Sequence, residues 1–453
     1  MAKMEDVENG VREVRKSLIK QELSCCKETS TNESESICMV LLCTAVAVCG
    51  SFEFGTCVGY SAPTQSEIMK DIGLSISEYS VFGSILTIGA MIGAVTSGYI
   101  ADFLGRKGAM RISAIICSIG WLSIYFAKGP YFLYFGRLSS GYGIGVLSYV
   151  SINHYHLSAR LRYDDELPMT GFLPCLLLLL GLVFIPESPR WLAKMGNQKE
   201  FTVALQKLHG KNADITREAS EIQECIEIQE SLPKAGIKDL FQRRYIRSVI
   251  VGVGLMVFQQ IGGINGIGFY ASEIFVSAGF SSGKLGTILM GTIQVPITMV
   301  GAILMDRSGR IPLLMVSASG TLIGTFITGV SFFLKEQGMY TEWVPMLVLC
   351  GILVYLGAFS IGMGAVPWVI MSEIFPLNMK GIGGSLVTLV NWFGSWAVSY
   401  AFNFLMNWSA PGTFFLFSAA CATTILFVAK MVPETKGRSL EEIQESLSNS
   451  QVT

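Results

Sequence analysis

Gly98-Tyr-Ile-Ala-Asp102-Phe-Leu-Gly105-Arg106-Lys107 decides the fold, because Met305-Asp-Arg-Ser-Gly309-Arg310 repeats its pattern about two hundred residues later. Each stretch lies between two apolar runs. A second pair repeats in the same order, as Pro186-Glu-Ser-Pro-Arg190 and Pro433-Glu-Thr-Lys-Gly-Arg438. Repeats of this kind between membrane-length runs indicate a chain built from two like halves, an arrangement typical of carriers that rock around a central site.

The composition is that of a membrane protein. Hydrophobic residues make up 51% of the chain and charged residues only 15%, which is less charge than a soluble domain carries. The net charge of −1 offers no basic surface, so no nucleic-acid partner is expected. The eleven cysteines show no metal-ligand spacing, and no phosphate-binding loop is present. We therefore expect no metal, no cofactor and no enzymatic activity.

Membrane-spanning helices are predicted throughout the chain, since a span needs about 20 mostly apolar residues. Eleven runs qualify and predict an all-α, polytopic protein: 37–60, 79–101, 109–127, 131–152, 167–185, 246–271, 284–305, 311–334, 344–370, 381–406 and 412–431. The predicted organisation is a cytosolic tail 1–35, a first transmembrane half 36–185, a cytosolic loop 186–245 with short amphipathic helices, a second transmembrane half 246–431, and a cytosolic tail 432–453.

The first half is predicted to be one span short. Basic residues favour the cytosolic side, which places both the N-terminal tail and 186–245 inside, although five spans between them would put them on opposite sides. The first half is also shorter than the second between matching motifs. The stretch 153–166 is too charged to span, since one central charge costs about 2.5 to 3.5 kcal/mol. A span is thus missing near residues 150–170, as in a splice variant or a mis-predicted gene model.

Motifs at the span boundaries carry a family resemblance. They are Gly136-Arg137, Pro186-Glu-Ser-Pro-Arg-Trp191, Gln259-Gln-Ile-Gly-Gly-Ile-Asn265, Asp306-Arg-Ser-Gly-Arg310, Pro367-Trp368, Ser372-Glu-Ile-Phe-Pro376, Asn391-Trp392 and Pro433-Glu-Thr-Lys-Gly-Arg438. In this order they resemble the sugar porter family of the major facilitator superfamily, most closely the early-response-to-dehydration type of plant monosaccharide transporter. The resemblance implies the major facilitator fold, with twelve spans in the family. It also implies transport of a hexose-like monosaccharide by alternating access, either facilitated or proton-coupled.

Amides and indoles inside predicted spans are the candidate sugar-binding residues. A sugar is a neutral polyol, and it needs uncharged donors and acceptors together with an aromatic surface. The alternatives are hydrogen bonds that hold helices together, and, for the indoles, core packing or an interfacial belt. The set consists of Gln259, Gln260 and Asn265, with Gln294, Trp368, Asn391 and Trp392 added by the resemblance.

Charged residues at the predicted cytosolic ends of the spans form a candidate gating network. Ion pairs there can hold two halves together in one state and part in the other. The alternative is a set of basic anchors at the membrane surface. The residues are Asp102, Arg106, Arg137, Glu187, Arg190, Asp306, Arg310, Glu373, Glu434 and Arg438.

Glu53 is a lone acid in the first predicted span, and it is a candidate proton carrier because intramembrane acids commonly mark proton pathways. Its alternative is a glutamate that faces a wet vestibule or pairs locally. Leu18-Ile19 faintly resembles a dileucine sorting signal and suits a vacuolar location, with the plasma membrane as the other possibility. The alternative functions are a non-transporting sugar sensor or an inert splice variant, because a missing span breaks the pairing of the halves. A carrier of another polyol such as inositol is a further alternative.

Overall fold

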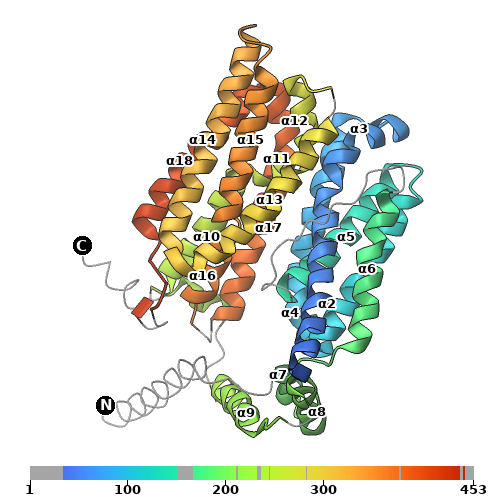
Figure 1. The fold of residues 1–453 in the computed structure, drawn as a ribbon, viewed down its shortest axis with the longest axis vertical. Coiled ribbons are helices and arrows are strands. Elements are labelled where there is room, and N and C mark those ends of the chain that lie inside the picture. Colours follow the sequence, from blue (N-terminus) through green and yellow to red (C-terminus); the bar gives the residue numbers. More distant parts are fainter. Residues whose placement is uncertain are drawn as a thin grey trace.

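The computed structural model describes residues 34–150, 167–210, 213–231, 236–243, 245–281, 283–376, 379–438 and 442–443. All regular structure in these ranges is helical, so the all-α prediction is confirmed. Two bundles stand side by side, one from each half of the chain (Figure 1). The predicted tail residues 1–33, with Leu18-Ile19, and most of 150–170 lie outside the described residues.

The first half holds one short and four long helices: α2 (Ser34–Gly59), α3 (Ser61–Ile72), α4 (Ile76–Tyr125), α5 (Pro130–Val150) and α6 (Leu167–Phe184). Ser75 and Glu78 form a capping box that starts α4, which satisfies backbone N–H groups that would otherwise lack partners. Gly105, with φ 79°, divides α4 into two helices. A residue with a side chain is strained at such a φ, so the glycine of the repeated motif places the turn.

The segment between the halves, predicted to be cytosolic, forms a small helical layer, and the end of the bundle next to it is called the cytosolic end. The layer consists of α7 (Pro189–Lys194), α8 (Gln198–His209), α9 (Thr216–Ser231) and the 3-10 helix η1 (Ile237–Phe241). Leu192, Phe201 and Leu205 are buried in a core of its own. Helices α8 and α9 lie within the segment where the sequence predicted amphipathic helices; α8 lies below the first bundle, and α9 lies to the left of α8 in the view of Figure 1.

The second half follows as nine helices in the described chain: α10 (Ile246–Ile261), α11 (Ile264–Phe269), α12 (Ala271–Ala278), α13 (Gly283–Ser308), α14 (Arg310–Glu336), α15 (Val344–Ile361), α16 (Val366–Ile374), α17 (Lys380–Trp408) and α18 (Ala410–Met431). Gly263, with φ 91°, separates α10 from α11. The ring of Phe417 lies where a Cβ at Gly263 would be. A glycine is therefore required there, and the break turns one predicted span into two helical segments.

Seven described helices are long and apolar enough to cross a bilayer, judged by length and composition. They include the 50-residue α4, which Gly105 divides. Many large apolar side chains on the bundle are exposed, for example Ile303, Phe326 and Leu426. A membrane-embedded surface is apolar in this way because lipid surrounds it. The predicted number of eleven spans stays a prediction.

Helices α5 and α6 run in the same direction. Helix α5 follows α4 after a short loop. It therefore starts at the end of the bundle opposite the Gly105 turn, which is the non-cytosolic end. Gly171, near the start of α6, packs against the indole of Trp121 at that same end of α4. At the cytosolic end, Lys107 Nζ donates to the carbonyl of Ile185, just after α6. Consecutive spans normally alternate in direction, so this parallel course agrees with the predicted missing span, which stays a prediction.

Candidate functional site

Four of the predicted amides converge where α10 breaks and meets α17. Gln260 Nε2 donates to Asn391 Oδ1 at 2.7 Å and lies 3.3 Å from Gln259 Oε1. Asn265 Nδ2 donates to Gln260 Oε1. In an unbroken helix, Gln260 and Asn265 would point about 140° apart. The turn at Gly263 brings the two side chains together, so the amide cluster depends on this break in the helix.

Three of the amides are buried and Asn265 is half-buried, and all four are bonded to one another or to broken helix ends. Gln259, Gln260 and Asn391 are 5%, 3% and 6% exposed. Gln259 Nε2 donates at 2.5 Å to the carbonyl of Met363, in the turn between α15 and α16. A buried amide without a hydrogen-bond partner is costly. Each of these amides has a partner, which is either another side-chain amide or a backbone carbonyl at a helix end. Since hydroxyl groups both donate and accept, a polyol can take over these bonds.

Trp392 lies beside the amide cluster with an unsatisfied donor. The residue follows Asn391 on α17 and is 7% exposed, and its indole N–H has no hydrogen-bond partner among the described residues. Phe54 of α2, in the other half, lies against it with ring centroids 6.1 Å apart. Buried indole N–H groups normally find a partner. The site therefore has a free donor and an aromatic surface between the two halves.

Trp368 and Gln294 are not part of this hydrogen-bonded cluster. Trp368 is half-buried and packs against the apolar core at the cytosolic side of the second half. Gln294 is half-buried on α13, a helix that packs on α15 and α12. No hydrogen bond or ring contact joins either residue to the four amides in the described chain. The predicted sugar contacts of Trp368 and Gln294 stay predictions.

Glu53 is enclosed in the first half. The residue is fully buried, and neither carboxylate oxygen has a hydrogen-bond partner among the described residues. The thiols of Cys117 and Cys175, which are only weak donors, lie near the carboxyl. Its neighbour Phe54 is the residue that contacts Trp392. Glu53 is therefore one residue away from the face that the first half presents to the amide cluster.

At the cytosolic end of each bundle, a glutamate carboxylate accepts hydrogen bonds from backbone N–H groups at the start of a helix. Glu187 Oε1 accepts from the backbone N–H of Lys107 at 3.0 Å. Glu434 accepts from the N–H groups of Arg310 and Ile311, both at 3.0 Å, at the start of α14. In each case the carboxylate lies at the start of a helix that follows a glycine of positive φ. Anions are favoured at helix N-termini, which explains why both motif pairs repeat together.

The pKa of Glu434 reflects this position. Partial burial by itself raises the pKa of the carboxyl. Hydrogen bonds from the four backbone N–H groups of Arg310, Ile311, Thr435 and Lys436 outweigh burial, and the net effect holds the pKa below its usual value.

Among the described residues, two ion pairs involve the remaining charged residues of the predicted network, and neither joins the two transmembrane halves. Arg310 and Glu373 form a largely buried ion pair at 2.7 Å in the second half. Asp102 pairs with Lys194 at 3.1 Å on the exposed surface. Arg190 and Arg438 are exposed. The side chain of Asp306 lies outside the described residues. Cross-half gating by this set stays a prediction.

The family model for sugar (and other) transporters matches residues 16–153 and 167–447. The chain belongs to the sugar transporter family. It is a multi-pass membrane transporter and not an enzyme. The interruption of the match, at residues 154–166, falls between α5 and α6, where the sequence predicts a missing span.

Similar proteins and structures support the assignment. This transporter is 61% identical over 444 residues to sugar transporter ERD6-like 16 of Arabidopsis thaliana, across 92% of each chain. It is 55% identical over 433 residues to sugar transporter ERD6-like 7 of the same plant, across 90% of this chain and 93% of that one. Its structure is similar to that of the proton:xylose symporter XylE of the major facilitator superfamily. The TM-score is 0.71 at 24% identity, over 91% of this chain and 100% of that one. The predicted major facilitator fold is confirmed.

The prediction that Arg137 lies at a cytosolic end was wrong. Arg137 is fully buried, and it lies about two turns into α5, which starts at the non-cytosolic end. Its guanidinium donates to the carbonyl of Cys57 at 2.6 Å and to Ser61 Oγ at 2.5 Å. Its carbon Cζ lies 5.1 Å from the ring centroid of Phe82. The error came from grouping all basic motif residues with the cytosolic anchors, although the direction of α5 places this arginine near the other side.

Sequence reasoning missed two residues that shape the site of this transporter. Phe54 is the first-half contact to Trp392, and only its place next to Glu53 could have drawn attention to it. Tyr355 of α15 donates at 2.9 Å to the carbonyl of Gly262 and thereby holds the broken end of α10. A single tyrosine in an apolar run gives no signal in the sequence, because its partner is a backbone group far along the chain.

Proposed function

We propose that this transporter moves a monosaccharide across its membrane by alternating access, with the sugar held by Gln259, Gln260, Asn265, Asn391 and Trp392. The observation that carries the proposal is the partnerless indole N–H of Trp392 beside three buried amides and the half-buried Asn265. A hydroxyl group of a sugar would satisfy that donor, and its apolar ring face would lie on the indole. The similar proteins are named as sugar transporters and a xylose symporter, which supports the same substrate class.

The contacts between the halves support alternating access around this site. Asn403 donates to Ser80 Oγ at 2.9 Å, and the ring of Tyr270 lies 6.3 Å from that of Tyr79. Both contacts join the second half to the non-cytosolic end of α4. The structure thus corresponds to a state closed on that side, in which the site would exchange sugar with the cytosol. An inward-open structure of XylE from E. coli is similar, with a TM-score of 0.70 at 25% identity, over 89% of this chain and 98% of that one.

Proton coupling is the finer question, and Glu53 is the residue that would supply it. A carboxyl buried without a hydrogen-bond partner is costly in its charged form. Its position next to Phe54 would link a change of its charge to the Trp392 surface. Facilitated diffusion remains the other candidate, in which Glu53 has a packing role. The vacuolar or plasma membrane location is an expectation from sequence alone.

The missing span favours a second candidate function, that of an inert variant or a sugar sensor. Pairing of the two halves requires a like set of spans in each. Helices α5 and α6 run parallel with no described span between them, so the first half lacks part of the wall that encloses the site. This candidate predicts sugar binding without flux.

The test uses the purified chain in proteoliposomes, with uptake of radiolabelled glucose, fructose, xylose and inositol. Beside it runs a chain that carries, between residues 150 and 167, the corresponding segment of ERD6-like 16. Trp392→Phe keeps the ring and removes the N–H, and it should weaken sugar affinity about tenfold, the loss of one net hydrogen bond. Uptake by the restored chain alone would assign this chain to the inert variant. Silence of both chains for every solute would refute transport.

A further inference from the structure

A carboxyl–amide pair bridges the two halves at the non-cytosolic end. Gln65 of α3 donates from Nε2 to Glu273 Oε2 of α12. Gln65 is 7% exposed, and its other polar atom, Oε1, is buried without a hydrogen-bond partner among the described residues. Helices α3 and α12 belong to opposite halves, so this bond holds the closed side together. The unsatisfied oxygen is the feature that requires an explanation.

The chemistry of the two groups explains it. A side-chain amide has donors on one side and an acceptor on the other, whereas a carboxylate has only acceptors. An ionised Glu273 can therefore satisfy the N–H group of Gln65 but never its oxygen. A neutral Glu273 can accept from Nε2 and donate its O–H to Oε1 at the same time. Protonation completes a two-bond ring between the halves and leaves no buried acceptor unpaired.

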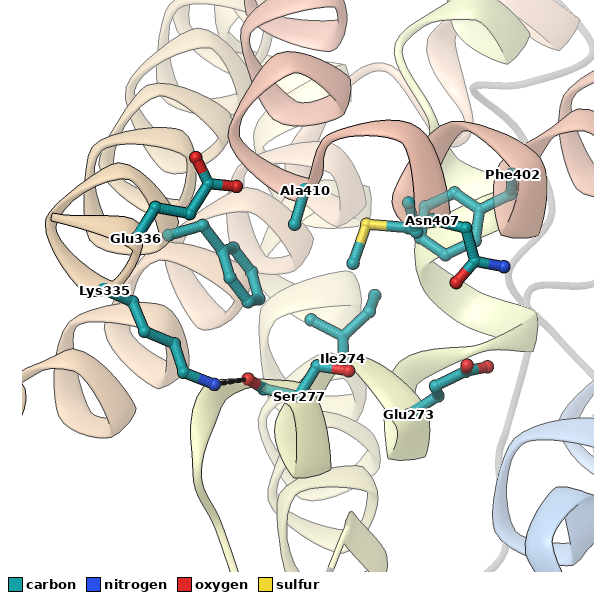
Figure 2. Close-up of a pocket in the computed structure, with 10 residues that line it drawn as sticks. Glu273, Ile274, Ser277, Lys335, Glu336, Phe402, Asn407 and Ala410 are labelled. Atoms are coloured by element: carbon teal, nitrogen blue, oxygen red, sulfur yellow. Dashed lines mark hydrogen bonds between the residues drawn. The ribbon is translucent and has the colours of Figure 1, made fainter. Parts of the chain in front are cut away.

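The surroundings of Glu273 supply no competing cation in the part of the chain that the structure describes. Glu273 lies on the wall of a cavity of about 300 Å³. At the end of the cavity away from Glu273, Lys335 donates to the carbonyl of Ser277, and Glu336 lies next to Lys335 (Figure 2). The helices α11 and α15 carry no Asp, Glu, Lys or Arg. The other groups nearby are exposed Glu67, Lys70 and Asp71 on α3, Tyr270 before α12, and Lys284 on α13, whose side chain lies outside the described residues.

We infer that Gln65 and Glu273 form a proton-binding latch, in which closing of the non-cytosolic side takes up one proton. The inference rests on the proposed alternating access of this transporter. When the halves part, Glu273 regains water and its proton is released to that compartment. The closed side is then favoured by acid in the non-cytosolic compartment and loosened by alkali there. The latch is separate from the sugar site and from Glu53.

The electrostatics of the closed state agree with this direction. Burial raises the pKa of Glu273, and the hydrogen bond from Gln65 only partly opposes burial. A group whose pKa is higher in the closed state favours closing below its ordinary pKa. That preference is lost as the pH rises through the raised pKa. The pH range over which the preference for the closed state is lost therefore begins near the ordinary carboxyl pKa and extends to higher pH.

The experiment measures the distance between the halves directly. Nitroxide labels at Lys70 of α3 and Val276 of α12, both exposed, are introduced through ketone amino acids, so that the native cysteines stay unlabelled. Double electron–electron resonance on sugar-free protein in lipid nanodiscs at pH 5 and pH 8 gives the ratio of open to closed forms. The ratio should rise severalfold from pH 5 to pH 8, because the buried carboxyl of the closed form binds a proton more tightly than the hydrated carboxyl of the open form.

Matched variants decide whether this pair is responsible. Glu273→Gln can form both hydrogen bonds at any pH, so its ratio should stay at the closed value of pH 5. The exchanged pair Gln65→Glu with Glu273→Gln restores one acid and one amide and should restore the pH response. A pH-independent ratio in the unaltered chain, a normal response in Glu273→Gln, or a flat response in the exchanged pair would overturn the latch. Because no sugar is present, failure of the latch is distinguishable from failure of transport, which uptake alone reports.

Discussion

The two halves of this transporter share the glutamate contact at their cytosolic ends and differ inside the membrane. In both, a glutamate binds backbone N–H groups after a glycine of positive φ, Glu187 beside Gly105 and Glu434 beside Gly309. Between those ends the second half brings together an amide cluster, whereas the described part of the first half, predicted to be one span short, offers a buried arginine and a lone acid. The contact between the glutamate and the helix start needs only a few local residues, while the sugar site needs a complete set of helices. A half can therefore keep this glutamate contact even when a helix around the site is absent.

The largest expected effect separates the contributions of the halves to sugar binding. Gln260→Leu removes the amide that joins Asn265 and Asn391, and it should weaken sugar binding about a hundredfold, since it deletes a donor and an acceptor at once. The matched first-half change Phe54→Leu keeps apolar volume and should cost less than about tenfold. Sugar-dependent quenching of tryptophan fluorescence measures both. Equal losses would show that the two halves contribute alike.

Gln260→Leu leaves buried amides without partners, so loss of folding has to be separated from loss of binding. Gln260→Asn keeps the amide on a shorter chain and should recover part of the affinity. Thermal unfolding in detergent accompanies each measurement. An unfolded Gln260→Leu together with unaltered affinity in Gln260→Asn would assign the amides to helix packing.

The next effect compares the two glutamates. Glu434→Ala leaves four backbone N–H groups without their acceptor, whereas Glu187→Ala leaves those of Lys107 and Ser188. At about 1 kcal/mol for each bond that water replaces incompletely, Glu434→Ala should destabilise more, by about 2 kcal/mol relative to Glu187→Ala. Apparent melting temperatures in the same detergent test the order, and the reverse order would contradict it.

The pH dependence of the glutamate contact in the second half follows from the lowered pKa of Glu434. The folded state binds a proton there less readily than the unfolded state, so the stabilisation is present above the ordinary carboxyl range. It is lost as the pH falls through the lowered pKa. Glu434→Gln should be less stable than the unaltered chain at pH 7, and the gap should narrow toward pH 3. A gap that stays constant over this range would show that the carboxylate charge has no part in this contact.

The smallest effect concerns the glycines. A Cβ at Gly105 would lie 2.6 Å from Glu187 Oε2, whereas one at Gly309 would lie 3.0 Å from Glu434 Oε2. Both alanine variants carry the strain of a positive φ, about 1 kcal/mol, but Gly105→Ala must also displace its glutamate further. We expect Gly105→Ala to lower the melting temperature more than Gly309→Ala. Equal shifts would mean that backbone strain alone sets the cost.

Much of the fold followed from the sequence because its determinants are local. Apolar runs of membrane length and the repeated glycine motifs together predicted the helices and the two halves, and the missing span stays a prediction. The amides Gln259, Gln260 and Asn265 could also be picked out, because polar groups in an apolar run are conspicuous. Arg137 was misplaced, since its motif alone does not tell which end of the helix it occupies.

The amino-acid order by itself determined that this chain is helical, lies in a membrane and repeats its glycine and glutamate motifs, because hydropathy and glycine spacing act over one or two turns. Tertiary structure alone decided that Gln260 meets Asn391, that Trp392 keeps a free N–H beside Phe54, and that Gln65 reaches Glu273 across the halves. Those contacts join residues more than a hundred positions apart, or lie in different halves, so only the packing of whole helices fixes which polar group finds a partner.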